Sequence, residues 1–303
     1  MDYFIGIDGG GTKTIGLLGN EDGEVLWSMK GGPTNYHSVG YQQTEEELSR
    51  ILIGLTLNKG IGMDHIKGLC MGAAGVDSKV DELRIHELIR KIGFQHNVWI
   101  YNDGITALVG ANDGRKGGVL ISGTGSIAWG IDSKGHIHRV GGWGHLIDDV
   151  GSGYFMGCLA LKAVMESHDG RRKDTLIWRN ISSNFNIGSH EDLIAFIYNQ
   201  QINKQVIASI APLVLVLYGE DEEADKIIET SVRELLKMVK VLMEKIGDDP
   251  MELALGGSIF TKSDIVMKLL SHEINKTYPK VNVHLPYKNP AEGALLLAME
   301  GGI

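Results

Sequence analysis

The chain has 303 residues, of which 43% are hydrophobic and 22% charged, and its 29 basic and 38 acidic side chains give a formal net charge of −9. This composition excludes a disordered or collagen-like chain, and the length suits one large domain or two smaller ones. The excess of acidic over basic side chains argues against a nucleic-acid partner, because a negatively charged surface would repel the phosphate backbone.

The cysteine content and the absence of long apolar segments exclude further classes. Two cysteines, Cys70 and Cys158, are too few for a disulfide scaffold or for a four-thiolate zinc or iron–sulfur site within one chain. The start of the sequence lacks the basic region and apolar stretch of a signal peptide, and no apolar run is long enough to cross a bilayer. We therefore expect a soluble, cytoplasmic protein with no membrane partner.

The first 117 residues predict an antiparallel meander followed by alternating helices and strands. The turn sequences GGGTKT and NEDG separate the first three apolar runs, and they are too short to hold a crossover helix. Beyond them, apolar residues recur alternately at helical spacing and in short buried runs. In chain order, the patterns predict strands at 3–8, 15–18 and 24–29, a helix at 44–57, a strand at 67–71, a helix at 79–92 and a strand at 98–101. Residues 106–111 are predicted to form the beginning of a further helix.

The remaining sequence repeats this pattern. Three apolar runs are again separated by turn sequences, SGTGS and DSKG, and helices and strands follow. They predict strands at 118–121, 127–131 and 136–140, helices at 153–166, 190–198, 204–217 and 222–246, a strand at 253–255, a helix at 263–272, a strand at 281–284 and a helix at 290–299. We therefore predict a duplicated α/β fold with domains at 1–117 and 118–303, in which the last helix, about 290–303, can pack back on the first domain.

The turn after the first strand is the strongest local signal for a ligand. Successive glycines leave backbone N–H groups unobstructed, and such a nest binds phosphate. The carboxylate at the end of the strand is suited to Mg²⁺, held directly or through water. The spacing is not that of a Walker A loop, and a hairpin without a ligand is the alternative. The turn consists of Asp8, Gly9, Gly10, Gly11, Thr12, Lys13 and Thr14.

A second glycine-rich turn, Gly123-Thr124-Gly125, stands at the equivalent place of the second half. It resembles a dinucleotide-binding fingerprint, but that motif requires a helix where this sequence predicts a strand. Two such turns in equivalent positions favour two loops that contact one polyphosphate. Gly256-Gly257 follows a later strand and suits either close approach of a nucleoside or a tight turn.

Polar residues in two further places are candidates for contact with a substrate. Asp103 follows a buried strand, where α/β sheets bind ligands, although an ordinary helix N-cap is the alternative. Trp143 lies between glycines and suits an exposed ring that covers a flat ligand such as a sugar, whereas His145 suits a structural hydrogen bond.

In this order along the chain, the motifs DGGGTKT, ND (102–103), SGTGS, GGWG, DVGSG and LGGSIF resemble those of the BadF/BadG/BcrA/BcrD ATPase family, in its N-acetylglucosamine kinase branch. This family belongs to the sugar kinase–Hsp70–actin superfamily. The resemblance implies two ribonuclease-H-like domains with an ATP cleft between them, ATP as co-substrate with Mg²⁺, and a homodimer. The implied activity is ATP-dependent phosphorylation of the C6 hydroxyl of an amino sugar.

The resemblance also implies roles for individual residues. Asp103 is the catalytic carboxylate, and Asp8 is the position associated with Mg²⁺. ATP and its phosphates are assigned to Gly9, Gly10, Gly11, Thr12, Lys13, Gly123, Thr124, Gly125, Gly256 and Gly257. The sugar is assigned to Asn35, Asp103, Gly142, Trp143, Gly144 and Asp149.

One departure from the family motif leaves the substrate open. Where the family has G-D-E-G-S, this chain has Asp148-Asp149-Val150-Gly151-Ser152. N-acetylglucosamine is the expected substrate, with N-acetylmuramic acid as a second and a glucosamine kinase as an alternative. An ATPase that activates a reductase or dehydratase would need bridging cysteines, of which each chain has only two. A non-enzymatic sugar sensor is disfavoured because no helix-turn-helix segment is visible.

Overall fold

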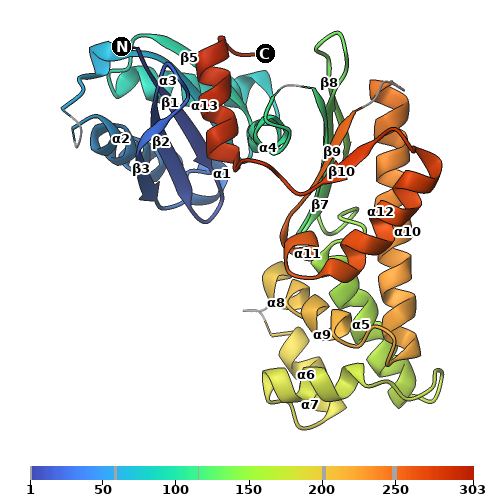
Figure 1. The fold of residues 1–303 in the computed structure, drawn as a ribbon. Coiled ribbons are helices and arrows are strands. Elements are labelled where there is room, and N and C mark those ends of the chain that lie inside the picture. Colours follow the sequence, from blue (N-terminus) through green and yellow to red (C-terminus); the bar gives the residue numbers. More distant parts are fainter. Residues whose placement is uncertain (1, 58–59, 115, 200–202, 248–250) are drawn as a thin grey trace. The chain divides into compact units, whose positions relative to one another are not determined.

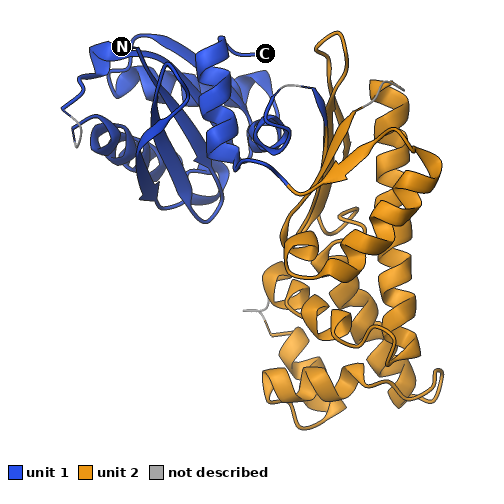
Figure 2. Cartoon of the chain, in the orientation of Figure 1, with its two compact units in different colours: residues 1–117, 286–303 blue, residues 118–285 orange. Residues whose placement is uncertain are grey.

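The computed structural model describes residues 2–57, 60–114, 116–199, 203–247 and 251–303. They fall into two units, residues 1–117 with 286–303 (unit 1) and residues 118–285 (unit 2), which Figure 2 shows in different colours. Each unit holds one five-stranded mixed sheet with helices packed against it (Figure 1). The α/β class predicted from the sequence is therefore confirmed.

Unit 1 is built on a sheet with the order β3-β2-β1-β4-β5. The predicted meander is present, because β1 pairs with β2, and β2 with β3, in antiparallel register. β4 is parallel to both β1 and β5, so these three strands end at the same edge of the sheet. The strands are β1 (Tyr3–Gly9), β2 (Thr14–Asn20), β3 (Val25–Gly31), β4 (Ile66–Ala73) and β5 (Asn97–Asn102).

Helices cover both faces of this sheet. Because side chains alternate along a strand, Ile5 and Ile7 of β1 enter the core formed with α2 and α3. Phe4 lies on the other face, with Cys70 and the apolar residues of α4 and α13. The helical segments of unit 1 are α1 (Tyr36–Val39), α2 (Tyr41–Leu57), the 3-10 turn η1 (Met63–His65), α3 (Lys79–Lys91), α4 (Asp103–Ala111) and α13 (Pro290–Glu300).

Helices α4 and α13 approach each other more closely than side chains would allow. A Cβ atom on Gly293 would lie 2.0 Å from the Thr106 carbonyl oxygen, and one on Gly110 would lie 2.5 Å from the Asn289 carbonyl oxygen. Glycine at both positions therefore lets the two backbones meet. This contact attaches α13, which follows unit 2 in the chain, to unit 1.

Unit 2 repeats the sheet of unit 1. Its order is β10-β9-β6-β7-β8, so in each unit the first strand lies between its meander partner and a later strand. β7 and β8 are antiparallel, whereas β9 is parallel to both β6 and β10. The strands are β6 (Gly117–Ser122), β7 (Ser126–Ile131), β8 (Ile137–Gly141), β9 (Glu252–Gly256) and β10 (Asn282–His284).

The helices of unit 2 form a larger core, centred on the apolar stripe of α10. This helix begins after Asp221, whose carboxylate accepts hydrogen bonds from the N–H groups of Glu223 and Ala224. The helices are α5 (Gly153–His168), α6 (Ile177–Phe185), α7 (His190–Ile197), α8 (Lys204–Ala208), α9 (Ala211–Leu215), α10 (Glu222–Ile246), α11 (Ser258–Thr261) and α12 (Asp264–Thr277).

Some of the predicted helices need correction. The single helix predicted at 204–217 is wrong, because α8 ends at Ala208 and α9 begins at Ala211. Pro212 has no N–H to donate to the carbonyl four residues earlier, and its ring would clash there, so one continuous helix is not possible. Helix α4 begins at Asp103 rather than at 106. The short helices α1, α6 and α11 were not predicted.

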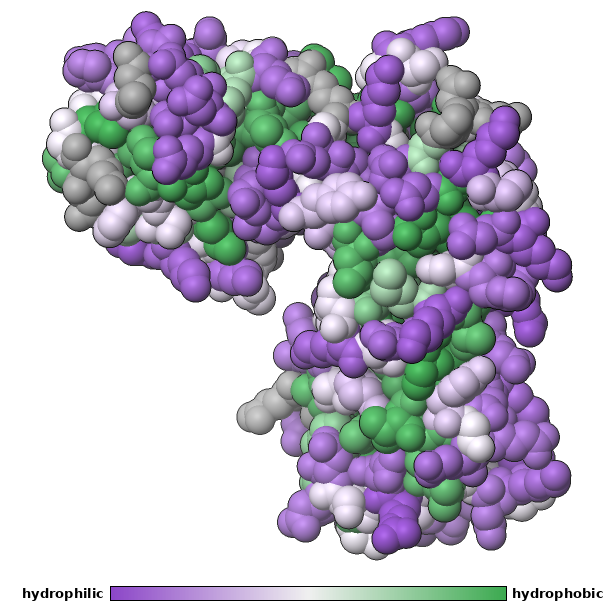
Figure 3. Space-filling model, in the orientation of Figure 1, coloured by the Kyte–Doolittle hydropathy of each residue, from purple (hydrophilic) through white to green (hydrophobic). Residues whose placement is uncertain are grey.

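Polar residues cover most of the face seen in Figure 3, with smaller apolar areas between them on each unit. In unit 1, the exposed apolar side chains include Val25 and Trp27 of β3, which is an edge strand. Over the described residues, no helix combines the length and the apolar character that a membrane span requires.

Candidate active site

The first part of the candidate site lies where the parallel strands of unit 1 end. Asp8 is the penultimate residue of β1, and Asp103 is the first residue of α4, directly after β5. Burial, followed by the negative charge of Asp103, raises the pKa of Asp8 to about 6, while the Lys13 ammonium acts in the opposite direction. The structure therefore brings the two predicted carboxylates into one electrostatic environment.

Asn102 holds Asp103 at the start of its helix. The Asn102 side-chain oxygen accepts a hydrogen bond from the Gly104 N–H at 2.9 Å, so Asn102 is the N-cap and the alternative in which Asp103 caps the helix is wrong. The Asn102 amide nitrogen donates to Asp77 Oδ1 at 3.1 Å. Burial, and to a smaller degree the charge of Asp77, raises the pKa of Asp103 above its usual range. Asp77 was not identified from the sequence, because nothing in a single chain marks it as a neighbour of Asp103.

The first glycine turn offers fewer free donors than the sequence predicted. The Gly10 N–H donates to the Lys13 carbonyl at 3.0 Å within the turn, so it is not available to a ligand. Gly11, Thr12 and Lys13 are exposed, and their N–H groups donate to no described residue. A Cβ atom at Gly11 would meet nothing within 4 Å. The turn therefore presents three successive backbone donors to the solvent.

Asn35 directly follows Thr34, whose N–H donates to the Gly10 carbonyl of this turn at 3.1 Å. It caps α1, because its side-chain oxygen accepts a hydrogen bond from the His37 N–H at 3.1 Å. The same oxygen would be 2.8 Å from a Cβ atom at Gly75, in the loop after β4. Its amide nitrogen donates to no residue in the described part of the chain. The Asn35 side chain is thus held through its amide oxygen, and its amide nitrogen can donate a hydrogen bond to a ligand.

The second glycine turn, in unit 2, is joined to the start of α5. The carbonyl oxygens of Gly123 and Thr124 accept hydrogen bonds from the N–H groups of Gly153 and Tyr154, at 2.7 and 3.2 Å. Together with the bond from the Phe155 N–H to Ser152 Oγ at 3.2 Å, these bonds satisfy the first N–H groups of α5 and fix the turn against this helix.

Asp149 supports the second turn rather than pointing into solvent. It is 6% exposed and has a φ of 58°, which is unusual for a residue other than glycine. Its Oδ1 accepts a hydrogen bond from the Ser126 N–H at 3.3 Å. Its Oδ2 would lie only 2.7 Å from a Cβ atom at Gly125, so the carboxylate packs closely against the turn. The sugar contact assigned to Asp149 stays a prediction.

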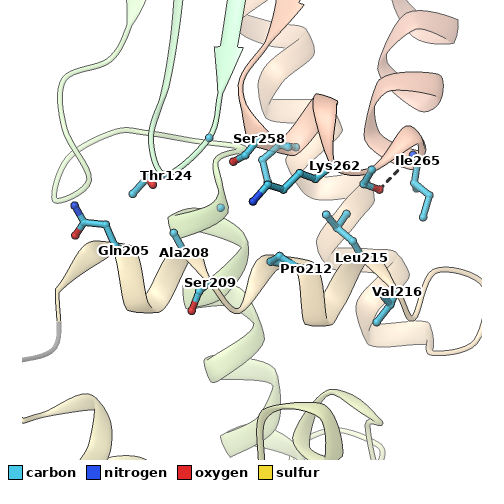
Figure 4. Close-up of a pocket in the computed structure, with 14 residues that line it drawn as sticks. Thr124, Gln205, Ala208, Ser209, Pro212, Leu215, Val216, Ser258, Lys262 and Ile265 are labelled. Atoms are coloured by element: carbon cyan, nitrogen blue, oxygen red, sulfur yellow. Dashed lines mark hydrogen bonds between the residues drawn. The ribbon is translucent and has the colours of Figure 1, made fainter. Parts of the chain in front are cut away.

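A cavity of about 410 Å³ opens beside this turn within unit 2. Gly123 and Thr124 contribute to its lining, the α8–α9 segment forms one wall, and Ser258 and Lys262 lie opposite (Figure 4). The Lys262 side chain reaches into the space, and none of the ion pairs among the described residues involves it. Gly256 and Gly257 do not line the cavity, but Gly257 packs against Ser122 and positions the segment that begins at Ser258.

Residues of the α8–α9 wall were missed by the sequence analysis. Gln205, Ser209, Pro212 and Val216 line the cavity, although they carry no motif. Trp143, with Gly142 and Gly144, lies instead in the loop between β8 and α5 and is 64% exposed, as predicted.

Comparison with known proteins shows which family the chain is similar to. The model of the BadF/BadG/BcrA/BcrD ATPase family matches residues 5–298. An N-acetylmuramic acid/N-acetylglucosamine kinase from Clostridium acetobutylicum is 35% identical over 98% of both chains, and an N-acetyl-D-glucosamine kinase from Dictyostelium discoideum is 31% identical over 98% of both. A crystal structure of a candidate N-acetylglucosamine kinase from Chromobacterium violaceum superimposes with a TM-score of 0.77 at 25% identity, covering 98% of this chain and 99% of that one.

Proposed function

Because the chain belongs to the BadF/BadG/BcrA/BcrD ATPase family, we propose that it is an ATP-dependent kinase that phosphorylates the C6 hydroxyl of an N-acetylated amino sugar. The prediction of an amino-sugar kinase is confirmed by the curated relatives, and the 35% identity over nearly the whole chain is the observation that carries it. N-acetylglucosamine and N-acetylmuramic acid are the proposed substrates. The attacked hydroxyl and the homodimer are our proposals.

Asp103 is proposed to orient the sugar hydroxyl and accept its proton. Phosphoryl transfer depends mainly on positioning and on stabilising the charge of the phosphates. The raised pKa of Asp103 makes its carboxylate a better proton acceptor than an ordinary aspartate. Asn102 keeps the carboxylate at the start of α4, where the acceptor would approach.

The residues of unit 1 fit magnesium as part of the nucleotide substrate. Among the described residues, no group of three or more His, Cys, Asp or Glu side chains could hold a metal alone. Mg²⁺ commonly takes one or two carboxylates and completes its shell with phosphate oxygens and water. Asp8, a half-buried carboxylate beside a second negative charge, supplies such a ligand. When bound, Mg²⁺ would neutralise charge on the transferred phosphate.

The nucleotide is proposed to use both glycine turns. Gly11, Thr12 and Lys13 offer backbone donors to phosphate oxygens, and Gly9 and Gly10 give the turn its shape. In unit 2, a cavity of about 410 Å³ is of a size that suits a nucleoside. Thr124 at its edge is proposed to contact phosphate, and the Lys262 ammonium, which pairs with no described carboxylate, supplies a positive charge.

A coupled assay of ADP release tests the proposed function. The panel is N-acetylglucosamine, N-acetylmuramic acid, glucosamine and glucose, with 6-deoxy-N-acetylglucosamine to test the attacked hydroxyl. We expect turnover with the N-acetylated sugars, less with glucose, and none with the 6-deoxy analogue. Equal kcat/KM for glucose would favour a general hexokinase, and ATP hydrolysis independent of every sugar would favour an activator ATPase. Light scattering tests the homodimer.

A further inference from the structure

The indole ring of Trp143 stands in a loop that would by itself be mobile. Its neighbours Gly141, Gly142 and Gly144 have φ values of 71°, 75° and 95°, which few residues other than glycine adopt. Glycine loses much conformational freedom on ordering, so a loop of this composition needs other contacts to keep one shape. The structure provides them on the ring and on the backbone.

Arg139 of β8 holds both the ring and the glycines. The carbon of its guanidinium group lies 4.3 Å from the centre of the Trp143 ring, which is a close cation–π contact. Its Nε donates to the Gly141 carbonyl at 3.0 Å, and its Nη2 donates to the Gly142 carbonyl at 2.6 Å. Only a planar group with several fixed donors can stack on a ring and make both bonds at once.

Arg139 is itself anchored in the sheet. It is the register partner of Trp129 across the β7–β8 ladder, and its guanidinium carbon lies 5.7 Å from the centre of that ring. Trp129 is only 8% exposed, so it belongs to the rigid part of unit 2. A continuous series of contacts therefore connects the buried Trp129, through Arg139, to the exposed Trp143.

Asp148 fixes the other side of the loop. Its Oδ2 accepts a hydrogen bond from the Trp143 N–H at 3.2 Å, and its own N–H donates to the Gly144 carbonyl at 2.8 Å. The resemblance to the family predicts glycine at this position, and glycine has no side chain to accept the first bond. Asp148 therefore supplies a constraint on Trp143 that a glycine at this position would lack.

We propose that Arg139 and Asp148 are positioning residues that hold Trp143 ready to receive the amino sugar. The inference rests on the proposed function, in which Trp143 covers the sugar. An aromatic ring held in the binding orientation before the ligand arrives loses less freedom on binding, so the affinity is greater. Neither residue needs to touch the phosphate or the reacting hydroxyl, so their effect is on sugar binding.

The test compares the variants Arg139→Gln, Asp148→Gly and Trp143→Ala with the double variant Arg139→Gln/Trp143→Ala. Arg233, an exposed residue of α10, gives the matched control Arg233→Gln. We expect KM for N-acetylglucosamine to rise about fivefold to tenfold in Arg139→Gln, while kcat and KM for ATP stay within about twofold. In the double variant, the arginine substitution should add no further loss to that of Trp143→Ala.

The outcomes separate this inference from the function on which it rests. Turnover of amino sugars by the wild type, with unchanged sugar KM in Arg139→Gln and Asp148→Gly, overturns the positioning role and leaves the kinase intact. If Arg139→Gln raises the KM for the sugar by the same factor in the wild type and in Trp143→Ala, the positioning role is also overturned, because the effect is then a general structural one. Absence of sugar phosphorylation in the wild type overturns both.

Discussion

Burial is the main cause of the raised pKa of Asp103. The first prediction concerns the role of this single carboxylate in catalysis. Asp103→Asn keeps the size and the position after Asn102 but cannot accept a proton. We expect kcat to fall by about 10²–10⁴-fold, the usual contribution of a positioned base, with unchanged ATP affinity by calorimetry. Asp64→Asn, at an exposed site in η1, is the control. A variant with more than about a tenth of wild-type kcat would contradict the catalytic assignment.

Asp8 gives a prediction about stability. Its pKa is raised to about 6 in the folded chain from an ordinary value of 3.8, so the folded state carries the ionised form at a cost above pH 6. That cost decreases as the pH falls from 6 and is absent below 3.8, where both states are protonated. Asp8→Asn should therefore raise the unfolding free energy at pH 7.5, by up to about 3 kcal/mol.

Thermal unfolding of both proteins, without nucleotide or Mg²⁺, between pH 4 and 8 checks this prediction about Asp8. The advantage of the variant should shrink steadily as the pH is lowered through 6. An advantage that is independent of pH would mean that the substitution acts through packing and not through the charge.

The residues that sequence reasoning found are those within compact motifs. Asp8 was identified because it stands at the end of a recognisable strand, and Asp103 because it directly follows one. Lys262, directly after α11, and Gln205 of α8 were missed because they reach the cavity from separate segments and carry no local pattern. The alternative in which Asp103 caps α4 was wrong because Asn102, an equally common type of N-cap, stands one residue earlier.

At the scale of elements, the first glycine turn is the part of the proposed nucleotide site that is most open to substitution. A Cβ atom at Gly11 meets nothing within 4 Å, whereas one at Gly10 would lie 2.9 Å from the Lys13 carbonyl oxygen. Gly11→Val should therefore leave the hairpin folded and weaken ATP binding by placing a branched side chain among the proposed phosphate donors. Calorimetric titration with ATP, together with an unchanged Tm, checks this. Full affinity in a folded variant would make the turn purely structural.

Periodicity predicted the long elements better than the short ones. The 25-residue helix α10 was found with its bounds because its apolar stripe repeats over many turns. Helix α6 was missed although Ile177, Ile181 and Phe185 recur at helical spacing, because it has only nine residues and Leu176, before it, makes no side-chain capping bond. The strands of both sheets were found because turn sequences separate the apolar runs of each meander and helical patterns separate the later runs.

At the scale of the whole molecule, the contact of α13 with α4 completes unit 1. Gly293→Ala would put a Cβ atom 2.0 Å from the Thr106 carbonyl oxygen, so the helices must separate. We expect a loss of about 1–3 kcal/mol of stability, seen as a lower Tm. In Gly114→Ala, the control, the nearest atom would be 3.8 Å away and Tm should change little. Equal Tm values for the two variants would show that the close approach is not required.

The place of α13 in the chain has a consequence for synthesis on the ribosome. Unit 2, residues 118–285, is made without interruption, but unit 1 lacks α13 (Pro290–Glu300) until unit 2 has been translated. At 5–20 residues per second, the nascent unit 1 waits roughly 10–35 s for the helix that covers Phe4 and Cys70. During that interval an apolar face of its sheet stays open to chaperones, so the segment translated first is among the last to reach its final structure.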